Sequence, residues 1–242
     1  MKKHAIHIKP FGEYTVLIEW PKTVSVAILD DIIRLSKYLE GTKLKSSEWE
    51  LVPAYNSLTV INNVSEIEFE KFKEQVLQWY SEMNVSNQSK SYIWKLPVCY
   101  DEEFGIDLND VAVRLNKSVS NIVKLHTQHV YTVYGIGFLP GFMYLGGLPI
   151  DLELSRKEIP RLKVVQGAVG LAAKQTGIYP QNSPGGWNII GNCPIPIFDA
   201  SKDEPCFVQV GDKVQFYPIS KAEYELRKIE VNIGIYKLEK KY

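Results

Sequence analysis

The sequence predicts an α+β domain followed by a mostly-β domain, and three features of the chain support this division. Strand-like and amphipathic helical segments alternate through residues 1–85. Short segments rich in β-branched and aromatic residues, interrupted by Gly and Pro, dominate residues 92–242. A polar stretch rich in Ser and Asn, residues 81–91, has the composition of a linker. We therefore expect two domains, residues 1–85 and 92–242.

The first domain is expected to begin with a strand and an amphipathic helix. Residues 14–20 are rich in β-branched and aromatic side chains, and Pro21 closes the run. Gly41 stands where a glycine commonly ends a helix. The apolar residues that recur at helical spacing before it are Ile28, Ile32, Leu35 and Leu39.

A strand pair and a second helix should follow. Residues 49–55 and 57–61 are the strand candidates, and Ser65 and Glu68 have the spacing of a capping box. The staple residues and the apolar face of this helix are Val64, Phe69, Phe72, Val76 and Trp79. A last strand at residues 92–99 would complete a ferredoxin-like α+β unit.

The second domain is predicted to be a closed barrel or sandwich. Two short helical patterns come first, at residues 108–115 and 119–126. The strand candidates after them are residues 130–135, 168–173, 187–191, 206–210 and 213–218. Ser220 and Glu223 have capping-box spacing for a late helix, and residues 231–238 are expected to form a final strand.

Composition excludes several classes of function. The 242 residues carry 28 basic and 28 acidic side chains, so no net charge attracts nucleic acid or an anionic membrane. No window approaches the roughly 18 apolar residues that span a bilayer, and no apolar signal segment follows the N-terminus. We expect a cytoplasmic protein. Cys99, Cys193 and Cys206 lack the spacing of a disulfide framework or a zinc site, so no metal is expected.

Two blocks rich in Gly, Pro and aromatic residues, residues 137–149 and 175–187, are the strongest candidates for a functional surface. Loops of this composition hold aromatic side chains on stiff backbone. Ser-Pro-Gly-Gly is also a good turn sequence, so a purely structural role stays open. The predicted substrate- or partner-binding residues are Phe138, Pro140, Gly141, Phe142, Tyr144, Tyr179, Ser183, Pro184, Gly185, Gly186 and Trp187.

Four polar residues are candidates for chemistry, although the common phosphate-loop, dinucleotide and nucleophile-elbow motifs are absent from the sequence. Arg161 suits a carboxylate or phosphate, with a salt bridge as the alternative. Gln175 and Thr176 can hydrogen-bond an amide or carboxylate. His126 shares an apolar helical face, so a core histidine is the main alternative to a catalytic one, and a metal ligand with His129 the weakest.

Several linked motifs resemble the family of the 5-oxoprolinase B subunit, also called the KipI or allophanate-hydrolase-subunit-1 family. They are Gly137 to Leu148, Pro160-Arg161, Gly167 to Gly170, Gln175 to Pro180 and Ser183 to Trp187, and the resemblance extends upstream to residues 98–108 and 125–126. Met143, Gln166 and Ala168 depart from the commoner pattern beside these motifs. The resemblance implies a ferredoxin-like domain followed by a cyclophilin-like β-barrel.

The same resemblance implies a multi-subunit enzyme. Subunits C and A would join this chain to cleave the lactam 5-oxoproline (pyroglutamate) to glutamate, and the assembled complex would use ATP. Arg161, Gln175, Thr176 and His126 would then orient substrate or stabilise charge in half of a composite site. One alternative is a KipI-like inhibitor of a sensor histidine kinase. A lesser alternative is a carboxyltransferase-like component of a urea or allophanate pathway.

Overall fold

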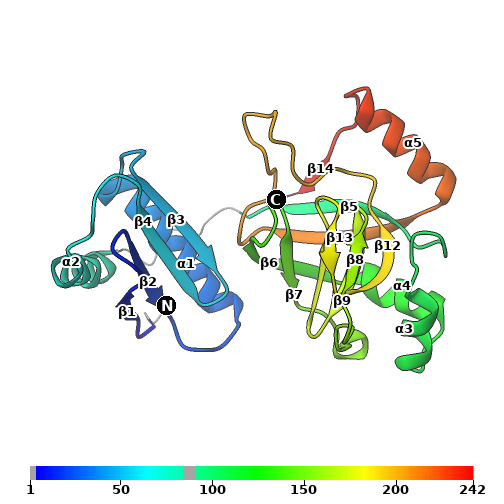
Figure 1. Cartoon of the computed structure of the whole chain (residues 1–242), viewed down its shortest axis with the longest axis horizontal. Coiled ribbons are helices and arrows are strands. Elements are labelled where there is room, and N and C mark those ends of the chain that lie inside the picture. The colour runs from blue at the N-terminus through cyan, green and yellow to red at the C-terminus, as the bar shows by residue number, and fades with distance from the viewer. Residues whose placement is uncertain (1–3, 84–90, 242) are drawn as a thin grey trace. The chain divides into compact units, whose positions relative to one another are not determined.

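The computed structural model of the chain describes residues 4–83 and 91–241. The chain divides into two compact units, Met1–Lys90 and Ser91–Tyr242 (Figure 1). Most of the predicted linker, residues 84–90, and the first three residues of the N-terminus lie outside the described residues. Each unit has its own hydrophobic core.

The first unit is a four-stranded antiparallel sheet with strand order β1-β2-β4-β3, packed with two helices. Val16 and Ile18 alternate with half-buried residues along β2, so one face of the strand enters the core. Both helices bury apolar side chains in that core. The elements are β1 (His7–Pro10), β2 (Thr15–Glu19), α1 (Val26–Tyr38), a π-helical turn (Leu39–Lys43), β3 (Trp49–Ala54), β4 (Ser57–Asn62) and α2 (Phe69–Glu82).

The predicted strands at residues 14–20, 49–55 and 57–61 are confirmed, and so is the first helix. Two boundary signals were wrong. Gly41 lies within the π-helical turn and does not end α1. α2 begins at Phe69, because the side chain of Asn62 binds the backbone N–H of Val64 and Ser65 and donates to the Ser65 hydroxyl. Ser65 is therefore hydrogen-bonded within the loop and does not form the predicted capping box.

The ferredoxin-like assignment of the first unit is not confirmed. The strand expected at residues 92–99 does form, as β5 (Ile93–Cys99), but it lies in the second unit. There it pairs in parallel with β13 (Lys213–Ile219). Placing β5 in the first unit was therefore wrong, and β1 occupies the edge beside β2. A partner so distant in sequence leaves no local signal.

Seven strands of the second unit close a barrel in the order β12-β9-β10-β7-β6-β13-β5, and β12 pairs with β5 to complete it. A Cβ at Gly191 would lie 2.7 Å from the Cys99 carbonyl oxygen, so this closure needs a residue without a side chain. The remaining barrel strands are β6 (Val130–Ile136), β7 (Met143–Gly146), β9 (Ala168–Ala172), β10 (Gln175–Ile178) and β12 (Asn188–Asn192).

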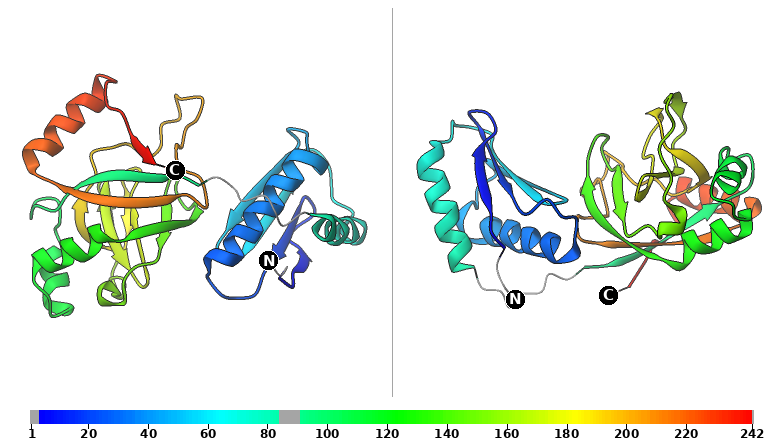
Figure 2. Two further views of the ribbon diagram at one scale, coloured as in Figure 1. Left: turned by 180° about the vertical axis from the view of Figure 1, so that it is seen from behind. Right: turned by 90° about the horizontal axis from the view of Figure 1, so that it is seen from below.

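Helices and short strands surround the barrel. α3 (Leu108–Arg114) and α4 (Val119–Gln128) lie together, whereas α5 (Lys221–Asn232) packs against a different part of the barrel (Figure 2). All three helices confirm the sequence prediction, and Ser220 and Glu223 form the expected capping box. β8 (Arg161–Val164) and β11 (Ser183–Gly185) form a separate two-stranded sheet. β14 (Glu239–Lys241) adds an edge strand beside β5.

Two strand predictions in the second unit were wrong. Residues 206–210 contribute only one isolated bridge, between Cys206 and Phe198. α5 continues to Asn232, so the predicted strand at residues 231–238 is replaced by the helix end and a turn, and β14 follows.

A buried carboxylate ties the first unit together. Asp31 of α1 is 1% exposed and accepts hydrogen bonds from the Trp20 indole (3.0 Å), the Tyr80 hydroxyl (2.5 Å) and Arg34 (3.2 Å). Burial raises the pKa of Asp31, but bonds from Tyr80 and Trp20 outweigh it and hold the pKa below its usual range. The carboxylate therefore joins α1 to the end of β2 and to α2.

We predict that Asp31→Ala destabilises the first unit by roughly 1–3 kcal/mol, because the buried indole N–H of Trp20 loses its acceptor. Thermal and urea unfolding followed by circular dichroism would measure the loss. Asp30→Ala is the matched control, since this neighbour makes no hydrogen bond or ion pair to the part of the chain that the structure describes. Equal losses in both variants would contradict the role given to Asp31.

Candidate functional site

A cavity of about 220 Å³ opens on the second unit, and we call it the aromatic pocket. It is formed by the β6–β7 loop, β7, the segment that leads into β8, and the loops around β11. Its lining residues are Phe138, Phe142, Tyr144, Arg156, Pro160, Tyr179, Pro184, Gly185, Gly186 and Trp187. The two glycine-rich blocks of the sequence therefore meet around one cavity.

Phe142 lies at the centre of this aromatic cluster. Its ring centroid is 5.2 Å from that of Tyr179 and 5.3 Å from that of Trp187, both in edge-to-face geometry. Phe142 and Tyr179 are 2% exposed, and Trp187 is half-buried. Phe138 is 74% exposed and has a φ of 67°, a conformation that costs free energy in a bulky residue. Such strain at the mouth of a pocket is typical of functional sites.

Glycine is required where the backbone approaches these rings. A Cβ at Gly185 would lie 2.3 Å from the Tyr179 hydroxyl oxygen. At Gly177 it would lie 3.1 Å from the Trp187 ring. The glycine content of the second block thus follows from close packing of backbone against Tyr179 and Trp187.

An ion-pair network around the buried carboxylate of Asp107 lies next to the pocket. Arg161 Nη2 donates to Asp107 Oδ1 at 2.5 Å, and Lys157 Nζ lies 2.9 Å from the same oxygen. Asp107 Oδ2 accepts the backbone N–H of Ile189 at 2.7 Å. Burial raises the pKa of Asp107, but the bonds from Arg161, Lys157 and Ile189 outweigh it and hold the pKa below its usual range.

Asp107 was missed by the sequence reasoning. It directly precedes α3 and has the N-cap position, which is a recognisable signal, but its side chain makes no capping bond and turns to the ion pairs instead. The structure contains the salt bridge that was the alternative for Arg161, with Asp107 as its partner. The other terminal nitrogen of Arg161, Nη1, is buried and has no hydrogen-bond partner in the described part of the chain.

His126 and Thr176 meet in the barrel interior, away from the aromatic pocket. His126 is fully buried, with Nε2 2.9 Å from the Thr176 hydroxyl and Nδ1 2.7 Å from the Tyr100 hydroxyl, and it stacks on Phe216. Burial, with a smaller contribution from His129, lowers the pKa of His126 to about 3. Its ring is therefore neutral near pH 7, as expected of a core histidine.

The four predicted catalytic residues do not line the aromatic pocket. Gln175 is half-buried on β10 beside Thr176, and Arg161 is paired with Asp107 and does not line the pocket. Pro140, Gly141 and Ser183 flank the pocket without lining it. The catalytic roles of Arg161, Gln175, Thr176 and His126 stay predictions.

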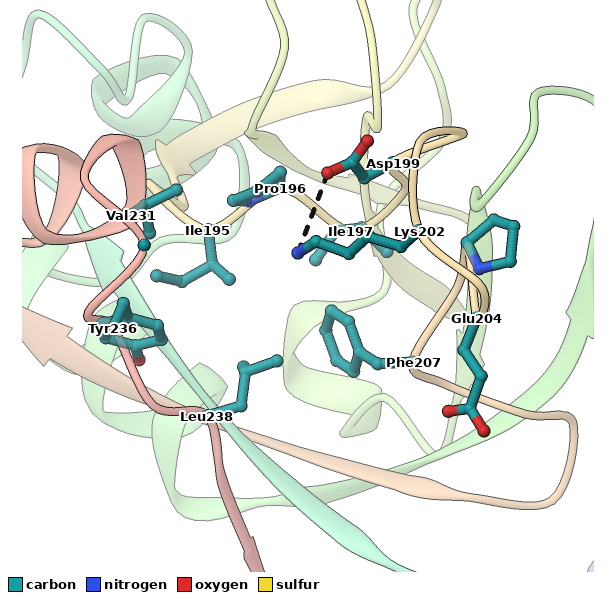
Figure 3. A pocket seen from close by; sticks show the side chains of 12 residues that line it. Ile195, Pro196, Ile197, Asp199, Lys202, Glu204, Phe207, Val231, Tyr236 and Leu238 are labelled. Atoms are coloured by element: carbon teal, nitrogen blue, oxygen red, sulfur yellow. Dashed lines mark ion pairs between the residues drawn. The ribbon is translucent and has the colours of Figure 1, made fainter.

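A second cavity, of about 180 Å³, lies between the loop after β12 and the C-terminal segment (Figure 3). Ile195, Phe207 and Leu238 supply apolar walls. Asp199 and Lys202 also line this cavity, with Lys202 Nζ 3.8 Å from Asp199 Oδ2. None of the predicted site residues lines it, so the aromatic pocket is the better candidate.

Comparison with known proteins identifies the family of this chain. The family described as carboxyltransferase domain, subdomain C and D, matches residues 6–208. The chain is 32% identical over 235 residues to the 5-oxoprolinase B subunit of Bacillus subtilis, covering 93% of this chain and 98% of that protein. For the 5-oxoprolinase B subunit of Haemophilus influenzae the identity is 36% over 211 residues, with coverage of 87% and 97%. The chain belongs to the family of the 5-oxoprolinase B subunit.

Solved structures extend the comparison. The protein TTHA0988 has a TM-score of 0.72 and 31% identity, and this chain covers 40% of its length. The urea carboxylase of Kluyveromyces lactis has a TM-score of 0.78 over 98% of this chain and 24% of that one, at 19% identity, which shows the fold alone. A urea amidolyase of Saccharomyces cerevisiae is a weaker match, covering 50% of this chain and 7% of that protein. Among the described residues, the helices are too short or too polar to cross a membrane.

We predict that Gly185→Ala distorts the aromatic pocket, because the new methyl group would clash with the Tyr179 hydroxyl. Overpacking of this kind costs about 1–3 kcal/mol. Near-ultraviolet circular dichroism and the melting temperature should both change. Gly186→Ala is the control, since its nearest neighbour would be 3.5 Å away. Identical behaviour of the two variants would refute the packing described for Tyr179.

We predict that His126 makes the second unit acid-sensitive. The unfolded chain binds a proton at His126 below about pH 6.5, whereas the folded pKa is about 3, so stability falls as the pH drops through this window. The slope from this group is at most about 1.4 kcal/mol per pH unit. His126→Gln should lower stability at pH 7 and flatten the slope between about pH 6 and 4. An unchanged slope in urea unfolding would count against a neutral buried His126.

Proposed function

We propose that this chain is the B subunit of a 5-oxoprolinase that converts 5-oxoproline and water to glutamate while ATP is hydrolysed to ADP and phosphate. Identity of 32% and 36% to B subunits of 5-oxoprolinase over most of their length is the observation that carries the proposal. The arrangement of the motif residues supports it, because eight of the eleven predicted binding residues line one cavity: Phe138, Phe142, Tyr144, Tyr179, Pro184, Gly185, Gly186 and Trp187.

The reaction explains the need for several subunits. A lactam amide is stabilised by resonance, so its carbonyl must be activated before water attacks, and ATP can supply that activation by phosphorylating the oxygen. Negative charge that develops on the oxygen requires fixed donors in a site that excludes water. Because the sequence holds no phosphate-loop motif, we place ATP binding elsewhere in the assembly and assign this chain a wall of the substrate site.

We further propose subunits C and A as partners. The relatives are named as one subunit of an enzyme, which implies other subunits, and TTHA0988 extends well beyond the part that this chain matches. The exposed side chains of Phe138, Ile159 and Leu162, on or near the pocket rim, suit a contact surface on one of them.

We also propose a cyclophilin-like class for the barrel, a ferredoxin-like class for the first unit, and a cytoplasmic location. Inhibition of a sensor histidine kinase likewise stays a prediction. The urea or allophanate alternative is less favoured, because the urea amidolyases match at 31% identity over half of this chain or at 26% over 84% of it, and this chain covers only 7% and 12% of those proteins.

We predict that the purified chain alone shows no 5-oxoproline-dependent ATP hydrolysis, because it supplies only part of the site. Addition of subunits C and A should restore glutamate formation coupled to phosphate release. Both products would be followed by chromatography and a phosphate assay. Turnover by the isolated chain at high purity would contradict the composite site, and inactivity of the full assembly would contradict the proposed function.

A further inference from the structure

The aromatic pocket contains one charged lining residue, Arg156. This side chain is exposed, and it makes no hydrogen bond or ion pair to residues 4–83 or 91–241. The segment that carries it enters β8 and contains two further cations, Lys157 and Arg161. Both of these pair with the buried carboxylate of Asp107.

The cations near the pocket differ in whether they have a partner. Lys157 and Arg161 both pair with Asp107, whose single negative charge compensates one of their two positive charges, and neither side chain lines the pocket. Arg114, which lies near the same segment, donates to Asn188 Oδ1 at 3.0 Å and lies 3.5 Å from Asp110. Of these four cations, only Arg156 lines the pocket, and within the described chain it has no ion-pair partner.

We propose that Arg156 is the residue that binds the carboxylate of a small ring-shaped ligand in the aromatic pocket. The inference rests on the proposed function and deepens it, because it moves the carboxylate contact from Arg161 to Arg156. A guanidinium stays charged at all physiological pH values and can hold both oxygens of a carboxylate by parallel hydrogen bonds.

The remaining lining fits the rest of such a ligand. The half-buried rings of Tyr144 and Trp187 offer apolar surface for a saturated or planar ring, and Phe142 packs against both of them. A volume of about 220 Å³ lies below the range of about 300–1,000 Å³ that is usual for drug-sized ligands, so the ligand is small. Aromatic walls with one cation select a compact carboxylate such as 5-oxoproline over a nucleotide.

The test measures binding of three probes to the full chain by titration calorimetry and ligand-observed NMR. The probes are 5-oxoproline, its neutral carboxamide, and proline, which keeps the carboxylate but lacks the lactam. 5-Oxoproline should bind about tenfold or more tightly than the carboxamide, because the carboxylate is negatively charged and can accept two parallel hydrogen bonds from Arg156, whereas the carboxamide offers one neutral oxygen.

Variants of Arg156 and Lys163 test whether the difference in affinity comes from Arg156. Arg156→Ala should lower 5-oxoproline affinity about tenfold or more and lower carboxamide affinity much less, because the carboxamide loses one hydrogen bond and no ion pair. Arg156→Lys should recover only part of the affinity, since lysine lacks the planar fork. Lys163→Ala is the matched control: it removes an exposed positive charge from β8 that does not line the pocket, and affinity should not change.

Each outcome decides the inference. Equal binding of 5-oxoproline and its carboxamide, an equal effect of Arg156→Ala and Lys163→Ala, or no carboxylate binding up to about 10 mM would overturn it. Arg156-dependent binding of proline alone would support the carboxylate site while contradicting 5-oxoproline as the substrate. Turnover of 5-oxoproline by the full assembly with unchanged KM in Arg156→Ala would preserve the proposed function and overturn the inference.

Discussion

The geometry of the aromatic pocket depends on one buried carboxylate, that of Asp107. Its backbone and Oδ2 both bond Ile189, which fixes the start of α3 against β12. Its Oδ1 holds Lys157 and Arg161 at the entrance to β8. Arg161 in turn is paired with Gly185 of β11, and the Lys157 backbone N–H bonds the Gly186 carbonyl, so the carboxylate sets the position of two pocket-lining glycines. Removing Asp107 would be costly, because two half-buried cations would lose their shared counter-ion and the Ile189 N–H would lose its acceptor.

The second unit has polar groups in its interior, which bond each other, and a polar group at the pocket, which a ligand can reach. His126 and Thr176 satisfy each other inside the barrel, where burial keeps the histidine neutral. Arg156 stands at the pocket on the outside of the barrel, where a ligand can reach it. The barrel therefore acts as a rigid scaffold, and the loops that connect its strands carry the candidate chemistry.

Sequence reasoning succeeded where the signal was local. The capping box of Ser220 and the helical spacing of α1 predict real helices, and the aromatic blocks predict which residues gather at the pocket. It failed where the outcome depended on distant partners. The parallel partner of β5, the capture of Ser65 by Asn62, and the pairing of Arg161 with Asp107 are set by tertiary contacts. The short strands β7, β8, β10 and β11 were missed because they lie in or beside stretches rich in Gly and Pro, which resemble loops.

The central claim is that the aromatic pocket, rather than another cavity of the second unit, is the ligand site. A crystal structure of the chain soaked with 5-oxoproline tests it most directly. Our account predicts a ligand whose ring lies against Tyr144 or Trp187 in the pocket of about 220 Å³. A ligand bound instead in the cavity between Ile195 and Leu238, with the aromatic pocket empty, would contradict it.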